Sequence, residues 1–487
     1  MDRIAERLKN KIMTAEDAAA LIKSGDCLGC SGFTMVGYPV EVPKALARRE
    51  GVDKLSVLTG ASVGDALDGT LARAGKLRYR APYQSGKDLR KAINRGEVGY
   101  NDFHLSCMPS SLNSGSGPRI DFAVIECAAV TEEGILPGFS VGASESFIAN
   151  CDRIILEVNH AIPTEILGMH DICSCRGEPL GIRSVTDRIG SALIPFDLDK
   201  VAAIVETDKI DSFPTYKTPD QISEAIADNI VEFLKREVRE GRQPENLHPI
   251  QSGVGNVANA VLSGLESSFR GLRMYTEVMQ DSAFELVRKG VITGASTTSL
   301  ALSEAAHREL YAELDEYRKK IVIRPQEISN NPEVIRRLQV IAMNTPIEVD
   351  IYGNVNSTHV MGTQIMNGIG GSGDFARSAG LTIFSTGSLA KDGSISCIVP
   401  MVSHTDHSEH DVDVIVTEWG AADLRWKTPR QRAEAIIRNC AHPDFREMLW
   451  DYFRRACEQR GGQTPHILGE ALSWHERYLE SGTMKLR

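Results

Sequence analysis

The sequence predicts an α/β protein with two doubly wound open α/β domains that face each other across a cleft. Short apolar runs alternate with amphipathic helical segments along the whole chain, as they do where helical crossovers join the strands of a sheet. The runs are almost continuously apolar, which favours parallel strands covered on both faces. The chain has 487 residues, and this length favours two domains or more over a single hydrophobic core.

The N-terminal half opens with a helix and a buried strand. Thr14 and Asp17 suit the start of a helix, and the apolar run at 27–30 leads into a glycine-bearing turn. The segment at 108–117, rich in Ser and Gly, is predicted to be a surface loop. Further strands are predicted at 55–59, 122–127, 154–158 and 201–206.

A change of composition near residue 216 marks the expected domain border. Thr218 suits a helix N-cap, Pro219 suits the first helical position and Gln221 would close a capping box. The helix that follows repeats isoleucines at a helical period and ends at a glycine. We therefore expect an N-terminal α/β domain at 1–216 and a C-terminal α/β domain at 217–487.

The C-terminal half repeats the alternation of strands and helices. Strands are predicted at 274–277, 291–293, 321–323, 346–352, 381–385, 395–399 and 412–417, and helices at 256–264, 282–289, 333–340 and 429–439. In open sheets of this kind, ligands bind at the carboxyl ends of the strands, where the topology switches. Functional side chains are therefore expected just after strands.

Composition and charge argue against several classes of protein. The formal net charge is −11 and no block of Lys and Arg offsets it, which argues against a nucleic-acid partner. No run approaches about 18 consecutive apolar residues, so no membrane span is predicted. Residues 1–13 lack a long apolar stretch, which argues against a signal or transit peptide. Cysteines inside apolar runs, such as Cys127, favour reduced thiols and a cytoplasmic location.

No metal site is predicted. Cys27 and Cys30 form a CxxC and Cys173 and Cys175 form a CxC, but neither has a second Cys or His pair at zinc spacing. Structural thiols are therefore expected. The segment HTDHSEH at 404–410 contains several ligand types, but its spacing is not that of a helical zinc site. We expect it to line a cleft or to form hydrogen bonds.

One carboxylate is predicted to be a reactive group. Glu277 ends a short apolar strand, and glycine-bearing turns at 251–256 and 367–374 precede and follow it in the chain. Backbone N–H groups of such turns can stabilise negative charge, and a carboxylate can attack an activated carbonyl such as a thioester. The alternative is a surface carboxylate between tight turns. Neither turn has the spacing of a dinucleotide or P-loop fingerprint.

Six motifs of the chain resemble one enzyme family. They are QSGVGN (251–256), YTEV (275–278), QEISNNPEVIRRL (326–338), IYGNVNSTHVMG (351–362), NGIGGSGDFARSA (367–379) and TEWGAADLR (417–425). Together they are similar to the acetyl-CoA hydrolase/transferase family, and within it to the succinyl-CoA:acetate and propionyl-CoA:succinate CoA-transferases. The likeness covers essentially the whole chain.

The resemblance implies a covalent mechanism. The family glutamate that matches Glu277 attacks the acyl-CoA carbonyl, giving an acyl-glutamyl anhydride and then a glutamyl-CoA thioester. Asn330 and Gly371 match positions that stabilise the oxyanion of each step. Glu418 matches a second glutamate that helps to order the active site.

The resemblance also implies substrates and assembly. Its CoA-binding loops match Gly253, Val254, Gly255, Asn256, Gly370 and Gly371. Acyl-CoA and short-chain carboxylates are the expected partners, with coenzyme A as a substrate and with no cofactor. A homodimer with one active site in each subunit is expected. Trp419 stands where the family more often has glutamine, and this departure changes the expected shape of the pocket.

The leading prediction is a CoA-transferase that moves CoA between acetate, propionate and succinate. An acyl-CoA hydrolase with the same residues is the first alternative, since the two differ only in whether water reaches the intermediate. A non-catalytic CoA-binding protein on the same fold is the second, although an intact Glu277 argues against it. A nicotinamide dehydrogenase is the most distant alternative.

Overall fold

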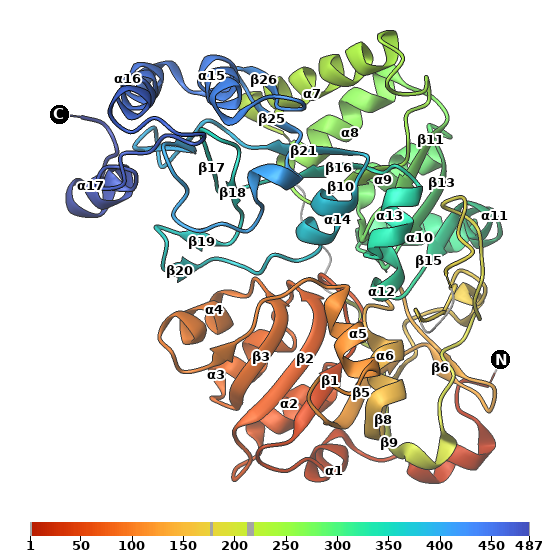
Figure 1. Ribbon diagram of the computed structural model, residues 1–487. Helices are drawn as coiled ribbons and strands as arrows, with labels where there is room; N and C mark the ends of the chain where they lie inside the picture. The colour runs from red at the N-terminus through yellow and green to blue at the C-terminus, as the bar shows by residue number, and fades with distance from the viewer. Residues whose placement is uncertain (1, 176–178, 212–218, 487) are drawn as a thin grey trace. The chain divides into compact units, whose positions relative to one another are not determined.

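The computed structural model describes residues 2–175, 179–211 and 219–486 (Figure 1). These residues form two compact units. Unit 1 comprises Met1–Thr215, Arg273–Leu338 and Asn367–Asp374, and unit 2 comprises Tyr216–Leu272, Gln339–Met366 and Phe375–Arg487.

The predicted division into domains at 1–216 and 217–487 stays a prediction, and its border lies outside the described residues. The compact units are not two continuous segments, because the chain returns to unit 1 at Arg273 and again at Asn367. Glu277, which the sequence places in the C-terminal domain, therefore packs within unit 1.

Unit 1 is built on a seven-stranded parallel sheet in the order β4-β3-β2-β1-β5-β8-β9. The chain runs outward from β1 to β4 and then from β5 to β9 on the other side, so the sheet is doubly wound and its topology switches between β1 and β5. The strands are β1 (Cys27–Cys30), β2 (Leu55–Ser62), β3 (Leu77–Gln84), β4 (Gly99–Tyr100), β5 (Ile120–Cys127), β8 (Cys151–Asn159) and β9 (Val201–Thr207).

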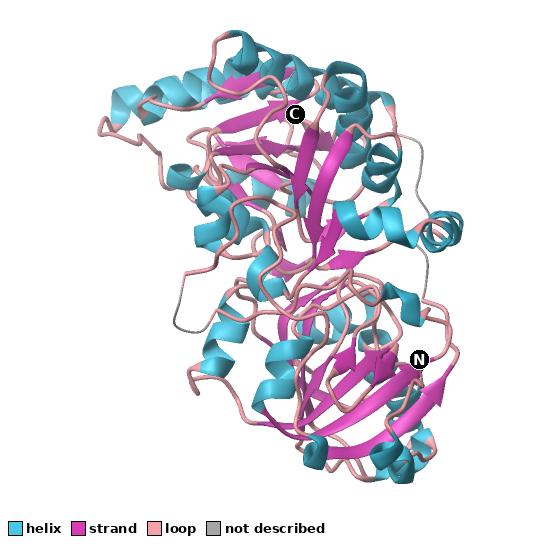
Figure 2. Ribbon diagram, turned by 90° about the vertical axis from the view of Figure 1, so that its right-hand side faces the viewer, coloured by secondary structure: helices cyan, strands magenta, loops and turns pink. Residues whose placement is uncertain are grey.

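Helices cover both faces of this sheet (Figure 2). Thr14 caps the first helix by accepting a hydrogen bond from the Asp17 amide, as predicted. The helices are α1 (Ala15–Ala20), α2 (Glu41–Arg48), α3 (Asp68–Arg73), α4 (Lys87–Asn94), α5 (Cys107–Asn113) and α6 (Ser144–Asn150), with short 3-10 turns η1 (Glu6–Lys11), η2 (Thr164–Ile166) and η3 (Leu198–Lys200). A small pair, β6 (Ala129–Val130) and β7 (Ile135–Leu136), follows β5.

The prediction of a surface loop at 108–117 is wrong for its first half. Helix α5 occupies most of this segment, with Met108 and Leu112 buried. The apolar pair at i and i+4 lies on one helical face and packs inward, which outweighs the weak helix propensity of the serines between them.

The segment 273–338 adds a second set of elements to unit 1. β13 pairs in parallel with β15, and β12 with β14. The strands are β11 (Leu272–Tyr275), β12 (Val278–Met279), β13 (Ile292–Thr297), β14 (Ser299–Leu300) and β15 (Ile321–Ile323), and the helices are α9 (Asp281–Arg288), α10 (Glu304–Ala312), α11 (Leu314–Lys320), α12 (Gln326–Ser329) and α13 (Pro332–Arg337). Directly after β15, the buried Arg324 Nε donates to Asp171 Oδ2 at 2.9 Å, which ties this segment to the N-terminal part of the unit.

Unit 2 is also α/β. Four of its strands, β10 (Ile250–Ser252), β16 (Ile341–Asn344), β21 (Leu381–Ser385) and β25 (Val414–Thr417), follow one another as parallel neighbours, and β26 (Gly420–Asp423) adds an antiparallel edge. The helices are α7 (Gln221–Arg239), α8 (Asn256–Ser268), α15 (Pro429–Cys440), α16 (Pro443–Gln459) and α17 (Ser473–Ser481), and α14 (Ser372–Ser378) begins in unit 1.

Short strands complete unit 2. They are β17 (Glu348–Asp350), β18 (Val355–Asn356), β19 (His359–Val360), β20 (Gln364–Ile365), β22 (Leu389–Ala390), β23 (Ile395–Ser396) and β24 (Ile398–Val399), with the 3-10 turn η4 (Glu409–Asp411). β17 is shorter than the predicted strand at 346–352. The Asp350 carboxylate accepts hydrogen bonds from the amides of Tyr352 and Asn354, and this turn ends the strand.

The start of α7 differs from the prediction. Thr218, the predicted cap, lies outside the described residues. The Asp220 carboxylate accepts a hydrogen bond from the Ser223 amide at 2.8 Å and is the N-cap, so Gln221 is the first helical residue and does not close a capping box.

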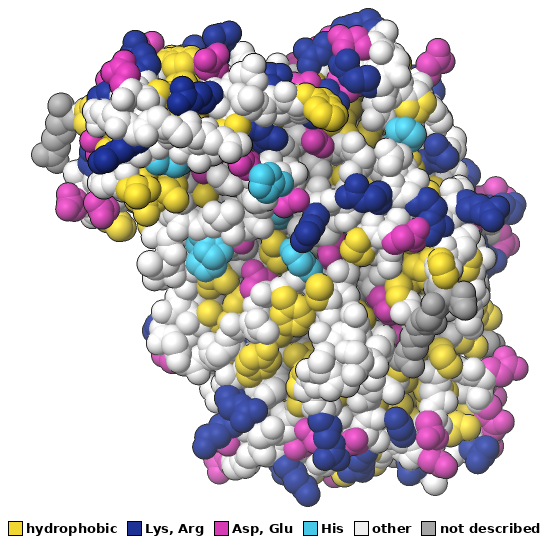
Figure 3. Space-filling view, in the orientation of Figure 1, with side chains coloured by type: hydrophobic (Ala, Val, Ile, Leu, Met, Phe, Trp, Pro, Cys, Tyr) yellow, Lys and Arg dark blue, Asp and Glu magenta, His cyan; other side chains and the backbone are white. Residues whose placement is uncertain are grey.

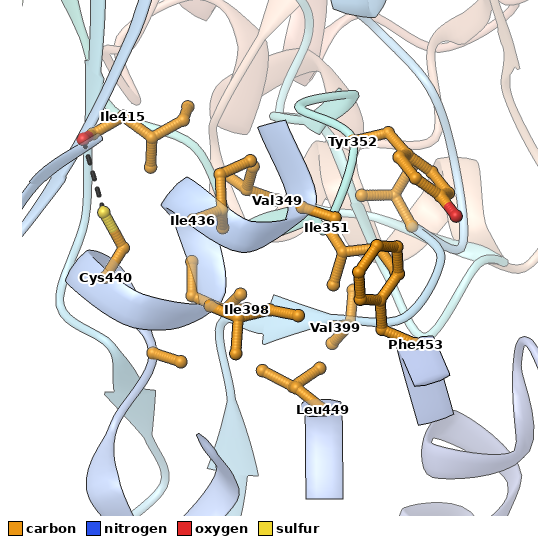
Figure 4. Close-up of a cluster of buried hydrophobic side chains, with 14 of the residues drawn as sticks. Val349, Ile351, Tyr352, Ile398, Val399, Ile415, Ile436, Cys440, Leu449 and Phe453 are labelled. Atoms are coloured by element: carbon orange, nitrogen blue, oxygen red, sulfur yellow. Dashed lines mark hydrogen bonds between the residues drawn. The ribbon is translucent and has the colours of Figure 1, made fainter. Parts of the chain in front are cut away.

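The core of unit 2 lies between its sheet and helices α15 and α16 (Figure 4). Ile415 of the sheet and Ile436 of α15 are both fully buried there, and the Cys440 thiol donates to the Ile415 carbonyl at 3.4 Å. The α/β class predicted from the sequence is confirmed in both units, whereas the cleft between two domains stays a prediction.

The surface mixes charges of both signs. Over the face shown in Figure 3, Lys and Arg side chains are interspersed with Asp and Glu side chains. Among the described residues, no helix combines the length and the apolar character that a membrane span requires.

A buried carboxylate of α7 should make unit 2 sensitive to acid. Burial raises the pKa of Glu237, but hydrogen bonds from Arg242 and Arg425 outweigh burial and lower this pKa to about 2. Because the folded pKa lies below the unfolded value, the stabilisation is complete above pH about 4.5 and is lost as the pH falls towards 2.

We expect Glu237→Gln to lower the free energy of unfolding by about 3 kcal/mol at pH 7 and by progressively less in acid. Urea denaturation at a series of pH values measures this difference. Glu232→Gln, on the exposed side of the same helix, is the matched control and should change little. A constant difference between wild type and Glu237→Gln from pH 7 to pH 3 would contradict the assignment.

Candidate active site

The backbone of Glu277 is held by the segment 297–299, which joins β13 to β14. Its carbonyl accepts three hydrogen bonds, from Thr297 Oγ1 at 2.8 Å, the Thr298 amide at 2.9 Å and the Ser299 amide at 3.1 Å. β11 ends two residues earlier, at Tyr275. Glu277 therefore lies just after the strand that was predicted to end on it, and its main chain is fixed.

The side chain of Glu277 meets Asn330. Asn330 Nδ2 donates to Glu277 Oε1 at 2.9 Å. Asn330 is fully buried at the C-terminal end of α12, where its amide donates to the Gln326 carbonyl at 2.8 Å. The Tyr275 hydroxyl donates to the Ile328 carbonyl, which ties α12 to the end of β11. Asn330 thus has a fixed position from which to donate to an oxyanion.

Gly371 lies against the same carboxylate. A Cβ atom at this position would overlap Glu277 Oε1 and Asn330 Nδ2, so no larger residue fits without movement. The loop is held on its other side, where the Ile369 amide donates to both oxygens of Asp102, at 3.0 and 2.9 Å. The neighbouring Gly370 lies close to the Tyr83 ring. Three predicted residues, Glu277, Asn330 and Gly371, are thereby brought together.

A second carboxylate beside these residues was not foreseen. Asp374 is buried, and its oxygens accept hydrogen bonds from Ser106 Oγ at 2.6 Å and from the Ser106 amide at 3.0 Å. It lies in the same glycine-rich motif as Gly371, but the sequence gives no sign that Ser106, 268 residues away, is its partner. The pair ties the loop to the start of α5.

The surroundings make Glu277 a weak acid. Burial raises its pKa, the hydrogen bond from Asn330 lowers it and the charge of Asp374 raises it, with a net value of about 7. Burial likewise raises the pKa of Asp374 to about 6. A carboxylate with a pKa near neutrality is more basic than an ordinary one and is only partly ionised at pH 7.

The predicted loop at 253–256 lies in unit 2. Its members are Gly253, Val254, Gly255 and Asn256. The Gly253 amide donates to the Met343 carbonyl at 3.3 Å, and the Val254 side chain is exposed. Gly255 has φ +107° directly before α8, a conformation that favours glycine. The role of this loop in CoA binding stays a prediction.

Glu418 also lies in unit 2, just after β25. Its carboxylate accepts hydrogen bonds from the Ser388 amide at 2.8 Å and from Ser388 Oγ at 2.5 Å. Trp419 Nε1 donates to the same hydroxyl at 3.1 Å, and the indole meets the His442 ring edge-on. Trp419 therefore shapes the surroundings of Glu418 directly. The ordering role predicted for Glu418 stays a prediction.

The cysteines and histidines of the other motifs have structural contacts. Burial raises the pKa of the Cys27 thiol to about 12, as expected for an inert buried thiol. The His404 ring lies 3.9 Å from the His359 ring, and Asp406 accepts from Thr358 Oγ1 at 2.9 Å. Within the described part of the chain, no group of three or more His, Cys, Asp or Glu residues is arranged to hold a metal ion.

The fold and this site define an α/β protein with a buried carboxylate of raised pKa after a strand, and comparisons with known proteins give its family. The model of the acetyl-CoA hydrolase/transferase N-terminal domain matches residues 1–207, and that of the C-terminal domain matches residues 307–453. The fold is similar to the crystal structure of RipA from Yersinia pestis, with a TM-score of 0.71 and 25% identity over 91% of this chain and 96% of that one.

Three curated relatives are similar over almost their whole lengths. A succinyl-CoA:acetate CoA-transferase of Clostridium kluyveri is 51% identical, over 98% of this chain and 91% of that protein. An acetyl-CoA hydrolase of Schizosaccharomyces pombe is 44% identical over 99% of each chain. A propanoyl-CoA:succinate CoA transferase of Escherichia coli K12 is 42% identical, over 97% and 98%.

The chain belongs to the acetyl-CoA hydrolase/transferase family. The family predicted from the six motifs is confirmed, and with it the prediction of an enzyme of the CoA-transferase type.

Because the pKa of Glu277 is raised, its ionised carboxylate should lower the free energy of unfolding above neutral pH. Because the folded pKa is higher than the unfolded value of 4.5, the folded state binds the extra proton between pH 4.5 and about 7, and stability falls as the pH rises through this window. We expect Glu277→Gln to remove the cost and to raise the free energy of unfolding by up to about 3 kcal/mol at pH 8, with little effect at pH 4.5.

Urea denaturation at both pH values measures this gain, and Glu132→Gln, at an exposed carboxylate of unit 1, is the control. An equal effect of Glu277→Gln at pH 4.5 and pH 8 would show that Glu277 titrates normally.

Proposed function

We propose that this enzyme transfers CoA between short-chain carboxylic acids through a covalent glutamyl-CoA thioester on Glu277. One observation supports this most strongly: the Glu277 carboxylate is held by Asn330 at 2.9 Å and faces Gly371, so nucleophile and oxyanion donors converge within one compact unit. Two relatives that are 51% and 42% identical are named as CoA-transferases, which supports the same reaction class.

The first half-reaction forms the thioester in two steps. A Glu277 oxygen attacks the thioester carbonyl carbon and the C–S bond breaks. CoA departs as a thiolate, and the acyl group remains on Glu277 as an acyl-glutamyl anhydride. The thiolate then attacks Cδ of Glu277, the anhydride C–O bond breaks, and the first carboxylate departs. Electrons balance without an oxidant or a cofactor, and coenzyme A is a substrate.

The second half-reaction reverses the first with a new acid. An acceptor carboxylate attacks Cδ of the glutamyl thioester, and CoA thiolate leaves as a new anhydride forms. The thiolate attacks the acceptor's acyl carbon, giving the new acyl-CoA and restoring the Glu277 carboxylate. We expect succinate, acetate and propionate as acids, after the printed names of the two transferase relatives.

The oxyanion of each step needs fixed donors. Asn330 Nδ2 already donates to the Glu277 carboxylate. The main chain of Gly371 approaches the same carboxylate so closely that a Cβ atom would not fit between them. Donors that are fixed before the reaction stabilise the developing charge without reorganisation. The basicity of Glu277, with its pKa of about 7, favours attack once the group is ionised.

Hydrolysis of acyl-CoA is the second candidate function. The relative from Schizosaccharomyces pombe, 44% identical, is named an acetyl-CoA hydrolase. The same anhydride or thioester would then be attacked by water in place of an acceptor carboxylate. The two functions share Glu277 and differ in how well the site excludes water.

The test is to mix the enzyme with succinyl-CoA without an acceptor, to add borohydride and to analyse the protein by mass spectrometry. We expect an adduct of the mass of CoA on the wild type, converted by borohydride to an alcohol at residue 277. Glu277→Ala should show neither species, while Glu132→Ala, at an exposed site, should show both.

Each other result would change the assignment. Steady release of CoA without a trapped species would favour the hydrolase. Binding of acyl-CoA with neither signal would place the chain among non-catalytic CoA-binding proteins. An adduct at another residue would remove Glu277 from the mechanism.

Gly371→Ala tests the close approach of the loop. The added methyl group must push Glu277, Asn330 or the loop out of place, so we expect kcat to fall by about 100-fold or more. Gly86→Ala is the matched control, because a Cβ there meets its nearest atom at 4.0 Å. Steady-state kinetics with succinyl-CoA and acetate measures both variants, and an unchanged kcat in Gly371→Ala would mean that this packing does not matter for the reaction.

A homodimer and a cytoplasmic location belong to the same proposal. Both rest on the family resemblance and on the composition, and size-exclusion chromatography with light scattering would test the first.

A further inference from the structure

Unit 1 contains a cavity that the proposed reaction does not use. Its volume is about 260 Å³, and it lies at the carboxyl ends of β5, β8 and β9. Glu126, Asn159 and Asp211 are among its lining residues, whereas Glu277, Asn330 and Gly371 are not. The strand ends beside the topological switch between β1 and β5 are the place where open α/β sheets bind ligands.

One carboxylate oxygen in this cavity is buried without a partner. Glu126 is only 4% exposed, and its Oε1 accepts a hydrogen bond from Asn159 Nδ2 at 2.8 Å. Its Oε2 has no hydrogen-bond partner among the described residues. Leaving a charged acceptor unpaired in a protein interior is costly, so such an atom points to a missing donor.

A second carboxylate, that of Asp211, lines the same cavity. Asp211 accepts hydrogen bonds from the Gly37 amide at 3.3 Å on each of its oxygens. Burial and then the charge of Asp211 raise the pKa of Glu126 well above its usual value, and burial raises the pKa of Asp211 to about 7. Two buried carboxyl groups in the wall of one cavity, with charges that act on each other, need either a proton or a cation to offset the repulsion.

The cations in the cavity wall are engaged elsewhere. Lys44 and Lys209 both approach Glu41, at 3.3 and 3.9 Å. In the described ranges neither Glu126 nor Asp211 has a Lys, Arg or His within ion-pair distance. Glu157, the other deep carboxylate, is satisfied by amides at the start of α2, including that of Val40 at 2.7 Å. Glu126 and Asp211 are therefore the cavity carboxylates that a bound cation would pair with.

We propose that this cavity binds the ammonium group of a small primary amine between the carboxylates of Glu126 and Asp211. An ammonium group has three donors and no acceptor, which suits two acceptor groups with a free oxygen. The cavity volume leaves room for an organic body of a few carbon atoms. A metal ion fits less well, because no cluster of three ligating side chains occurs among the described residues.

The test measures binding of four-carbon probes to the acyl-CoA-free enzyme by isothermal titration calorimetry. The probes are n-butylammonium, the neutral n-butanol and the anionic butyrate, which are similar in size and differ in charge. We expect n-butylammonium to bind and n-butanol to bind at least about tenfold more weakly, since a charge-assisted hydrogen bond is worth about that factor. Butyrate should not compete with n-butylammonium.

Substitutions in the cavity test whether n-butylammonium binds at these two carboxylates. Glu126→Gln and Asp211→Asn keep the side-chain volume and remove one charge each, and each should weaken n-butylammonium at least about tenfold. Glu132→Gln, an exposed carboxylate outside the cavity, should bind like the wild type. Neither Glu126 nor Asp211 takes part in the proposed reaction, so retained acyl-CoA turnover in both variants shows that they fold.

Three results would overturn the proposal: no binding of n-butylammonium, equal binding of n-butanol, or affinity that neither variant changes. If the variants do not fold, a crystal structure of the wild type with n-butylammonium decides, and an ammonium group found away from both carboxylates would also overturn it. Binding is measured without acyl-CoA, so failure here leaves the proposed transferase untouched, and the reverse also holds.

Discussion

The close contact between Gly371 and the Glu277 carboxylate is the constraint on which the candidate site depends. It requires a glycine, since any Cβ would overlap both Glu277 and Asn330. It also requires that the Gly371 loop and the end of β11 each be held in place. In such a close-packed contact, a shift of one segment would displace the other. The hydrogen bonds to the Glu277 carbonyl hold the strand end, and the hydrogen bond from the Ile369 amide to Asp102 holds the loop.

The same constraint has an electrostatic consequence. Packing backbone against a carboxylate removes water, which raises the pKa of Glu277 to about 7 before any substrate arrives. Asn330 partly offsets the cost with one hydrogen bond, and Asp374 adds to it. The protein thus keeps a basic, poorly solvated carboxylate at a fixed point, and the loss of stability there is of the kind that functional sites carry.

Buried carboxylates recur at strand ends in unit 1, and their environments separate their roles. Glu157 receives amides from the start of α2 and is structurally satisfied. Glu277 meets a side-chain donor and a glycine loop. Glu126 keeps an oxygen without a partner among the described residues. The sequence contains all three as carboxylates in or after apolar runs, and only their neighbours distinguish the helix cap from the proposed nucleophile and from the proposed site for a cation.

The sequence by itself determined the α/β class, most strand positions and the residue types of the reactive motifs, because apolar periodicity and turn chemistry are local properties. It also led to the family, through motifs that are long enough to be specific. Only the tertiary structure decided which residues meet. Asn330 lies 53 residues from Glu277, and Ser106 lies 268 residues from Asp374. Such pairs depend on the order of the strands in a sheet, and so does the return of segment 273–338 to unit 1. That order is set by the packing of the whole chain and cannot be read from local sequence.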